Sequence, residues 1–288
     1  MKPLLLSACC AVLLHTGVVM ATPGCPPHYQ QINDSNALLV LGGTATGPVK
    51  QVVVGEFGKD VDRQKRMLAK FDACGVLLQA NISVDKNEGN VVMKAVQSIT
   101  RVEDGWQTAY DISVFVIRAG EAEPVTRKEG IISYMTGRNG TITSSTDTFL
   151  LQGVKGFTAT TNSFDARFRL IKSVARGSDS LANGESIYQW NKKNQLTSSF
   201  SGSNRMFLRY DSQDRELMLR TLTTSPLSQL HTVDECQLWD DRGNCTLSYS
   251  RETELFPAGM IRRDITTAYR FEYWDKAGRA EEDDRTFP

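Results

Sequence analysis

The sequence predicts an all-β protein, mainly β, built as an antiparallel meander of hairpins with few or no helices. Three observations support this fold class. β-Branched and aromatic residues alternate with polar ones along most of the chain, Gly, Asn, Asp and Pro separate these stretches, and sustained helical periodicity is scarce.

Residues 1–21 predict a cleavable secretion signal. Lys2 supplies a positive charge, an apolar stretch runs from Leu4 to Met20, and cleavage is expected between Ala21 and Thr22. A membrane anchor is the alternative, but polar residues interrupt the stretch, and a bilayer span needs about 20 mostly apolar residues. We therefore expect export to the periplasm, with no transmembrane segment in the mature chain.

An outer-membrane lipoprotein is a weaker alternative. The sequence that ends at Cys9 resembles a lipobox, the lipidation motif of bacterial lipoproteins. It lies too early in the signal, because the apolar segment continues past it. Cys25 lacks the usual leucine three residues before a lipidated cysteine. The mature region, 22–288, is expected to form a β-rich envelope domain, with a division into two sub-domains near 177–185.

Strands are expected in six stretches bounded by turn residues: Lys50–Phe57, Gly75–Ile82, Trp106–Arg118, Gly130–Thr136, Ala166–Ala175 and Phe207–Tyr210. The best helix candidate is Asp60–Lys70, which is equally compatible with a strand whose charges face outward.

Five segments share one turn pattern: an aromatic residue, then Asp or Asn, two variable residues, and a residue that can adopt positive φ. A type I turn followed by a bulge requires these residue types, so each segment is predicted to be a hairpin tip. The first turn positions are Asp72, Asn191, Asp211, Asp240 and Asp275, and the positive-φ positions are Gly75, Asn194, Asp214, Gly243 and Gly278. Residues 137–140 predict a further hairpin of a different type.

These turns resemble the YD repeats of large bacterial surface proteins, in which such hairpins join into a continuous antiparallel sheet. Their spacing is too irregular for a tandem array, so convergent turn chemistry is the simpler explanation.

Several longer stretches occur in the order seen in the YnfC-like family of uncharacterised bacterial envelope lipoproteins. They are residues 47–50, the charged strand leading to Cys74, residues 207–211, and the segment from Cys236 to Cys245 around Trp239 and Asp240. The resemblance covers about two thirds of the mature chain at low identity. It implies an envelope address and fold rather than an activity, and the poor lipobox of this chain departs from the family.

The mature chain retains four cysteines, an even number that predicts two disulfides in an oxidising compartment. Cys236 and Cys245 flank one turn and favour a local pair, which leaves Cys25 for Cys74. A regular hairpin would place Cys236 and Cys245 on opposite faces, so this pairing requires an extra bulge or an early end to the ladder. Without either, the two local cysteines would pair with Cys25 and Cys74.

Composition and motifs give little sign of catalysis, so an enzyme is not favoured. The formal net charge is 0, which gives no basis for nucleic-acid binding. Only His28 and His231 remain in the mature chain, and the cysteine spacing does not fit zinc. No cofactor is expected either, because the glycine-rich stretch 42–47 lacks the Lys-Ser/Thr ending of a phosphate loop.

We therefore expect a non-enzymatic binding or structural component of the cell envelope, with another envelope or secreted protein as its partner. An exposed edge strand or a sheet face would supply the contact surface. The alternatives are a cell-wall glycan hydrolase that uses two carboxylates and a periplasmic immunity protein against a delivered toxin. The sequence does not specify the oligomeric state.

Overall fold

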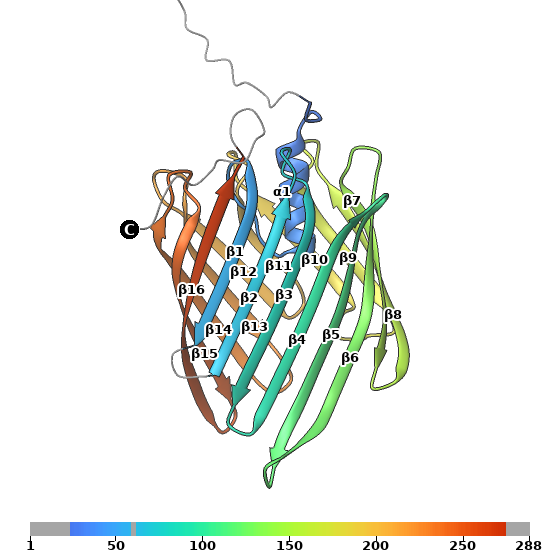
Figure 1. The fold of residues 1–288 in the computed structure, drawn as a ribbon, viewed down its shortest axis with the longest axis vertical. Coiled ribbons are helices and arrows are strands. Elements are labelled where there is room, and N and C mark those ends of the chain that lie inside the picture. Colours follow the sequence, from blue (N-terminus) through green and yellow to red (C-terminus); the bar gives the residue numbers. More distant parts are fainter. Residues whose placement is uncertain (1–23, 59–61, 275–288) are drawn as a thin grey trace, which may run out of the picture.

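The described residues, 24–58 and 62–274 of a computed structural model, form a closed antiparallel barrel of 16 strands and one α-helix (Figure 1). Each strand pairs with the next along the chain, and the last strand pairs with the first. This confirms the all-β meander of hairpins. The prediction of an exposed edge strand as a contact surface is wrong for the described residues, because closure of the barrel pairs every strand on both sides.

The elements follow one another with short connections. Their bounds are α1 Tyr29–Val40, β1 Val49–Gly58, β2 Asp62–Phe71, β3 Leu77–Glu88, β4 Val91–Val102, β5 Gly105–Arg118, β6 Glu121–Thr136, β7 Ile142–Leu151, β8 Val154–Phe164, β9 Leu170–Gly177, β10 Gly184–Trp190, β11 Leu196–Phe200, β12 Asn204–Tyr210, β13 Glu216–Thr224, β14 Gln229–Trp239, β15 Cys245–Phe256 and β16 Gly259–Tyr273.

The charged stretch Asp60–Lys70, equally compatible with a helix and a strand, is strand β2 for all its described residues. Its side chains alternate between the two faces of the wall: Met67 and Ala69 face inward, whereas Arg66 and Leu68 face outward. Pairing with β1 and β3 satisfies its backbone groups, and this long-range pairing overrides the helical propensity of the segment.

The position at which two sub-domains were expected to divide lies within a hairpin. Strand β9 ends at Gly177 and β10 begins at Gly184, and the two strands pair directly, with Ala175 opposite Gly184. The wall of the barrel is therefore continuous across residues 177–185.

Six turns at one end of the barrel share the same pair of backbone hydrogen bonds. The first residue donates to the carbonyl of the fifth, and the fourth donates to the carbonyl of the first. The first residues are Asp72, Gly137, Asp165, Asn191, Asp211 and Asp240. The fourth residues all have positive φ: Gly75 78°, Gly140 87°, Phe168 62°, Asn194 63°, Asp214 66° and Gly243 86°. The predicted turn positions Asp275 and Gly278 lie outside the described residues.

Two of these turns correct the sequence interpretation. The turn at Gly137 is of the same kind as the others, not a different type, because Asn139 supplies the side-chain cap by accepting from the N–H of Thr141 at 3.1 Å. The predicted strand from Ala166 begins instead at Leu170, because residues 165–168 form a turn with Phe168 at its positive-φ position.

Aromatic residues that precede three of these turns bond to the neighbouring strand. Trp190 donates its indole N–H to the carbonyl of Leu170 (2.7 Å), and Tyr210 donates its hydroxyl to that of Leu196 (2.8 Å). Trp239 donates to the carbonyl of Glu216 at 2.9 Å. Each acceptor is the first residue of its strand, so these bonds fix where the strand begins.

Candidate functional site

Helix α1 lies inside the barrel at the end that carries the six turns (Figure 1). Asn33 donates to the carbonyl of Cys74 at 2.7 Å, and Asn36 donates to the carbonyl of Gly140 at 2.9 Å. Ser35 donates to the carbonyl of Phe168 at 3.0 Å. Because these partners belong to three turns spread around the barrel, only a helix inside it can reach them all. The sequence did not indicate this helix.

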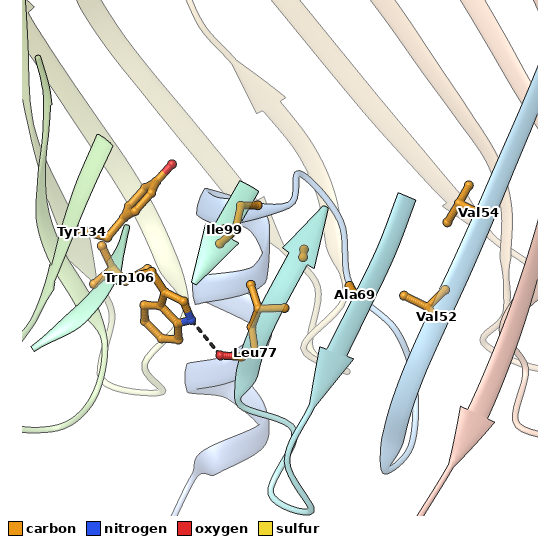
Figure 2. Packing of buried hydrophobic residues seen from close by; sticks show 9 residues of the cluster. Val52, Val54, Ala69, Leu77, Ile99, Trp106 and Tyr134 are labelled. Atoms are coloured by element: carbon orange, nitrogen blue, oxygen red, sulfur yellow. Dashed lines mark hydrogen bonds between the residues drawn. The ribbon is translucent and has the colours of Figure 1, made fainter. Parts of the chain in front are cut away.

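Inward-facing side chains pack against α1 (Figure 2). Val52, Ala69, Ala80, Ile99 and Thr108 are paired in register on five adjacent strands, and all five are buried. This row defines the inner face of the wall. The apolar residues of the helix, including Leu39 and Val40, complete the cluster.

Trp106 closes the cluster beside this row. Its side chain is 2% exposed, and its indole N–H donates to the carbonyl of Leu77 at 2.8 Å (Figure 2). The bond satisfies a polar group that burial would otherwise leave unpaired. The helix and this cluster pack together at the turn-bearing end, on the side of β1–β7.

The structure contains two disulfides. Cys25 pairs with Cys74, with 5.5 Å between the Cα atoms, and so ties the segment before α1 to the turn after β2. Cys236 pairs with Cys245, with 5.8 Å between the Cα atoms. The extra irregularity that this pair requires is present, because the β14–β15 register shifts between Cys236 and Trp239. The predicted cleavage site at Ala21 and Thr22 lies outside the described residues.

Farther from α1, the inner wall of β2–β5 carries apolar side chains that are not covered, together with Lys65, Lys86 and Gln97. Met67, Ile82, Val84, Ala95 and Ile112 share the inward face with the buried row, yet all five are partly exposed. Side chains in a filled core are buried on all sides. Their partial exposure therefore shows that space inside the barrel reaches this wall.

The part of the inner wall on β13–β16, across β1 from β2, carries polar side chains. Ser248, Ser250 and Thr267 face inward and are buried. The Ser248 hydroxyl lies beside the Asp234 carboxylate on the adjacent strand and beside Tyr269. A hydroxyl next to a carboxylate can donate to it, so neither group needs a further partner.

Two further carboxylates face the interior near the helix. Glu216 stands five residues after the first turn residue Asp211. The residues at the same position of four other turns are buried and apolar: Leu77, Ile142, Leu170 and Leu196. Asp34 lies on α1, and both it and Glu216 interact electrostatically with Tyr210.

The protein raises the pKa values of these acids. Burial raises the pKa of Asp34 from 3.8 to about 7. Burial also raises the pKa of Glu216, with a further contribution from the charge of Asp234, and burial raises that of Asp234. Glu216 is accessible to solvent, but it faces the interior, where the surrounding wall still disfavours its charge.

Acids at the far end of the barrel are instead paired with arginine. Arg263 contacts Glu88 (2.5 Å), Glu254 (2.8 Å) and Glu252 (3.7 Å). Arg63 contacts Glu252 at 2.8 Å. These ion pairs link strands on both sides of the β1–β16 closure. They therefore stabilise the barrel wall, and their carboxylates are already paired with arginine.

The outer wall carries charges along its strands. The outward-facing set includes Arg66, Lys94, Asp111, Arg127, Glu129, Arg220, Arg251 and Asp264. Asp111 pairs with Arg127 at 2.6 Å, and Arg251 pairs with Asp264 at 3.5 Å. Outer-membrane barrels present a lipid-facing apolar band about 25 Å tall, and these charges interrupt any such band on this wall.

A shallow groove of about 820 Å³ crosses β1–β5 at mid-length. Most of its lining belongs to the outward-facing rows, including Val53, Leu68, Val96 and Ala109, with Arg66 and Asp111 among the polar residues. Residues of the inward-facing rows, including Met67, Ile82 and Tyr110, also line it.

The two histidines lie far apart in the fold. His28 directly precedes α1, with its ring 5.2 Å from that of Phe168, whereas His231 is exposed on β14. Within residues 24–58 and 62–274, no group of three or more His, Cys, Asp or Glu residues could hold a metal ion. In the same residues, no helix is both long and apolar enough to cross a membrane.

The chain matches no protein-family model. No curated protein matches it either. Among solved structures, it is similar to a porin-like protein from Bacteroides uniformis ATCC 8492, with a TM-score of 0.47, 10% sequence identity, and coverage of 79% of this chain and 99% of that chain.

Proposed function

We propose that this chain is a non-enzymatic periplasmic binding protein that holds an amphipathic envelope molecule inside its barrel. The observation that carries the proposal is the inner wall of β2–β5. Its middle carries apolar, partly exposed side chains, and the outer wall carries charges along its strands. Apolar surface left open to water inside a protein marks a site for an apolar group.

The division of the inner wall supports an amphipathic ligand rather than a purely apolar one. The apolar side, with Ile82, Val84 and Ile112, would hold a hydrocarbon portion. The polar side, with Ser248 and Asp234, offers hydrogen-bonding groups to a polar portion. Helix α1 blocks one end of the barrel, so the ligand would enter from the other end.

The predicted signal at residues 1–21 and the two disulfides support a periplasmic location, because disulfides persist in oxidising compartments. The charged outer wall supports a barrel surrounded by water.

Binding of the apolar fluorescent probe N-phenyl-1-naphthylamine to the purified mature protein tests the proposal. Ala95→Trp places a large side chain inside the barrel, and we expect at least a tenfold weaker affinity for the probe. Ala268→Trp is the matched control, because Ala268 is exposed on the outer face of β16. Its affinity should equal that of the wild type.

A third variant separates the interior from the outer groove. Ala109→Trp fills the groove without entering the barrel, since Ala109 faces outward. Loss of binding in Ala109→Trp, with Ala95→Trp unaffected, would overturn the proposal in favour of a ligand or partner in the groove. Circular dichroism of all three variants checks that the barrel is intact.

A further inference from the structure

The end of the barrel opposite α1 exposes large apolar side chains at its hairpin tips. We call the described connections at this end the rim: residues 89–90, 119–120, 152–153, 178–183, 201–203, 225–228 and 257–258 (Figure 1). Leu181 and Leu227 lie within the rim and are 87% and 76% exposed. Val154 (69%) and Met260 (62%) lie within two residues of it. These four are the most exposed large apolar side chains among the described residues.

The six turns at the α1 end have different tips. Their two middle residues are small, polar or charged, as at 192–193, 212–213 and 241–242. Such residues are usual in turns, because they lie in water and adopt turn conformations readily. Single exposed apolar residues are common on proteins, but a group of them along one rim marks an interaction surface.

Ordered turns present the two leucines of the rim. The N–H of Leu181 donates to Oδ1 of Asp179 at 3.1 Å, and Asp179 pairs with Lys128 at 3.1 Å. The N–H of Leu227 donates to the hydroxyl of Ser225 at 3.2 Å. Because backbone and capping bonds hold these turns while both leucine side chains stay exposed, the fold does not require leucine at either position.

Cations without acidic partners lie beside these tips. Lys155 directly follows Val154, and Arg262 lies two residues after Met260. Arg205 is the second residue of β12, just after the connection 201–203. All three cations are exposed, and their side chains lie in no ion pair or hydrogen bond among the described residues.

The acids of the same part of the rim are already neutralised. Those nearest the rim on β7–β16 are each paired with a cation: Asp179 with Lys128 (3.1 Å), Glu185 with Lys172 (2.8 Å) and Glu254 with Arg263 (2.8 Å). The β5–β6 connection is instead followed by two acids, Glu121 and Glu123. The rim from β7 to β16 is therefore apolar at its tips and positively charged behind them. An anionic bilayer is complementary, with negative headgroups over an apolar interior.

We propose that the β7–β16 part of the rim docks on the surface of a bilayer that contains anionic phospholipid. The four apolar tip residues enter the boundary between headgroups and acyl chains, and the three unpaired cations contact the headgroup phosphates. The barrel rests on the membrane without crossing it. This inference does not depend on a ligand inside the barrel. If one is bound, docking places the end opposite α1, its entrance, against the bilayer.

Flotation of the purified mature protein with lipid vesicles tests the docking. The protein should bind vesicles of phosphatidylglycerol and phosphatidylethanolamine at least about tenfold more tightly than vesicles of phosphatidylcholine alone, because its cations are attracted to negative headgroups. Raising the salt concentration to about 1 M should weaken this binding, since the Debye length falls to about 3 Å.

Leu181→Ser and Leu227→Ser, combined, test the apolar tips. They should weaken binding to the phosphatidylglycerol vesicles at least about tenfold, because two leucine side chains no longer leave water for the bilayer. Leu238→Ser is the matched control, since Leu238 is 57% exposed next to the last residue of β14, at the α1 end. Its binding should equal that of the wild type.

Lys155→Gln and Arg205→Gln, combined, test the charge. Each cation near an anionic bilayer contributes about fivefold in affinity, so this double variant should bind at least about tenfold more weakly. Arg66→Gln and Lys70→Gln, combined, are the control, because both residues face outward on β2, away from the rim. The control should bind like the wild type.

A tryptophan at the rim reports insertion directly. Leu227→Trp should shift the fluorescence emission to shorter wavelength when phosphatidylglycerol vesicles are added, relative to the unsubstituted protein. Leu238→Trp should show no such shift.

The proposal is wrong if the protein binds neither kind of vesicle, or if the double leucine variant binds like the wild type. It is also wrong if the wild type sediments as a dimer that the two serine substitutions dissociate, because the rim would then join two copies of the chain. Binding of dextran sulfate without binding of vesicles would assign the cations to a soluble polyanion instead. Probe binding inside the barrel is measured without vesicles, so the proposed function stands or fails separately.

Discussion

Arg263 on β16 and Glu88 on β3 form an ion pair inside the barrel, with 2.5 Å between Nε and Oε1, although β1 and β2 lie between their strands. The Arg263 side chain is 2% exposed, and it also contacts Glu254 at 2.8 Å. The pair therefore spans the closure at which the last strand of the chain meets the first.

Arg263→Met should destabilise the protein strongly, because it leaves Glu88 and Glu254 without their arginine inside the barrel. Removing one partner of a buried ion pair costs about 3–5 kcal/mol. Urea denaturation measures the loss, with Arg262→Met as the control, since Arg262 is exposed on the outer face. Equal stability of the two variants would contradict a role for Arg263 in closing the barrel.

Trp190→Phe should lower the free energy of unfolding by about 1–3 kcal/mol, because it leaves the carbonyl of Leu170 without its donor at 2.7 Å. Tyr249→Phe, on the exposed outer face of β15, should change stability by less than about 0.5 kcal/mol. Chemical denaturation of both variants gives the comparison.

Removing the two disulfides should have unequal effects. The loop closed by Cys25 and Cys74 has a sequence separation of 49, and that closed by Cys236 and Cys245 one of 9. Loop-closure entropy predicts losses of about 4 and about 2.5 kcal/mol for the respective double serine variants. Hydrogen exchange should also show faster exchange in α1 for the first variant alone; equal protection of α1 in both would contradict its tethering by Cys25.

Asp34→Asn should stabilise the protein at pH 8 but not at pH 4. A carboxyl whose folded pKa is raised from 3.8 to about 7 binds its proton more tightly in the folded state, so the wild type loses stability as pH rises between these values. The full shift in the pKa of Asp34 corresponds to a loss of at most about 4 kcal/mol in the free energy of unfolding, and water inside the barrel reduces this loss. Thermal unfolding at both pH values measures the difference, with Asp85→Asn on the exposed outer face as control.

Local chemistry explains which features the sequence indicated. Turn residues such as Asp72 act through their own backbone neighbours, with Oδ1 accepting from Cys74 and Val76 at 2.9 Å, so a short sequence window contains the signal. The turn at Asp165 was missed because Phe168 is an uncommon residue at positive φ.

The interior residues gave no such signal. Nothing adjacent to Asp34 or Glu216 in the sequence distinguishes them from solvent-exposed acids. Their special character arises only because α1 enters the barrel and the turn after β12 places Glu216 at a position that four other turns fill with buried leucine or isoleucine. Aligning the six turns on their first residue would have revealed Glu216 as the one acid at this position.

The sequence by itself determined the β-rich fold, the hairpin turns and the even set of cysteines, because alternation, turn propensity and composition act over a few residues. Only the tertiary structure decided that β1 pairs with β16 and that α1 occupies one end of the barrel. These features depend on contacts between residues as far apart as Val49 and Tyr273. The free energy of closing such a loop is not encoded in any local pattern.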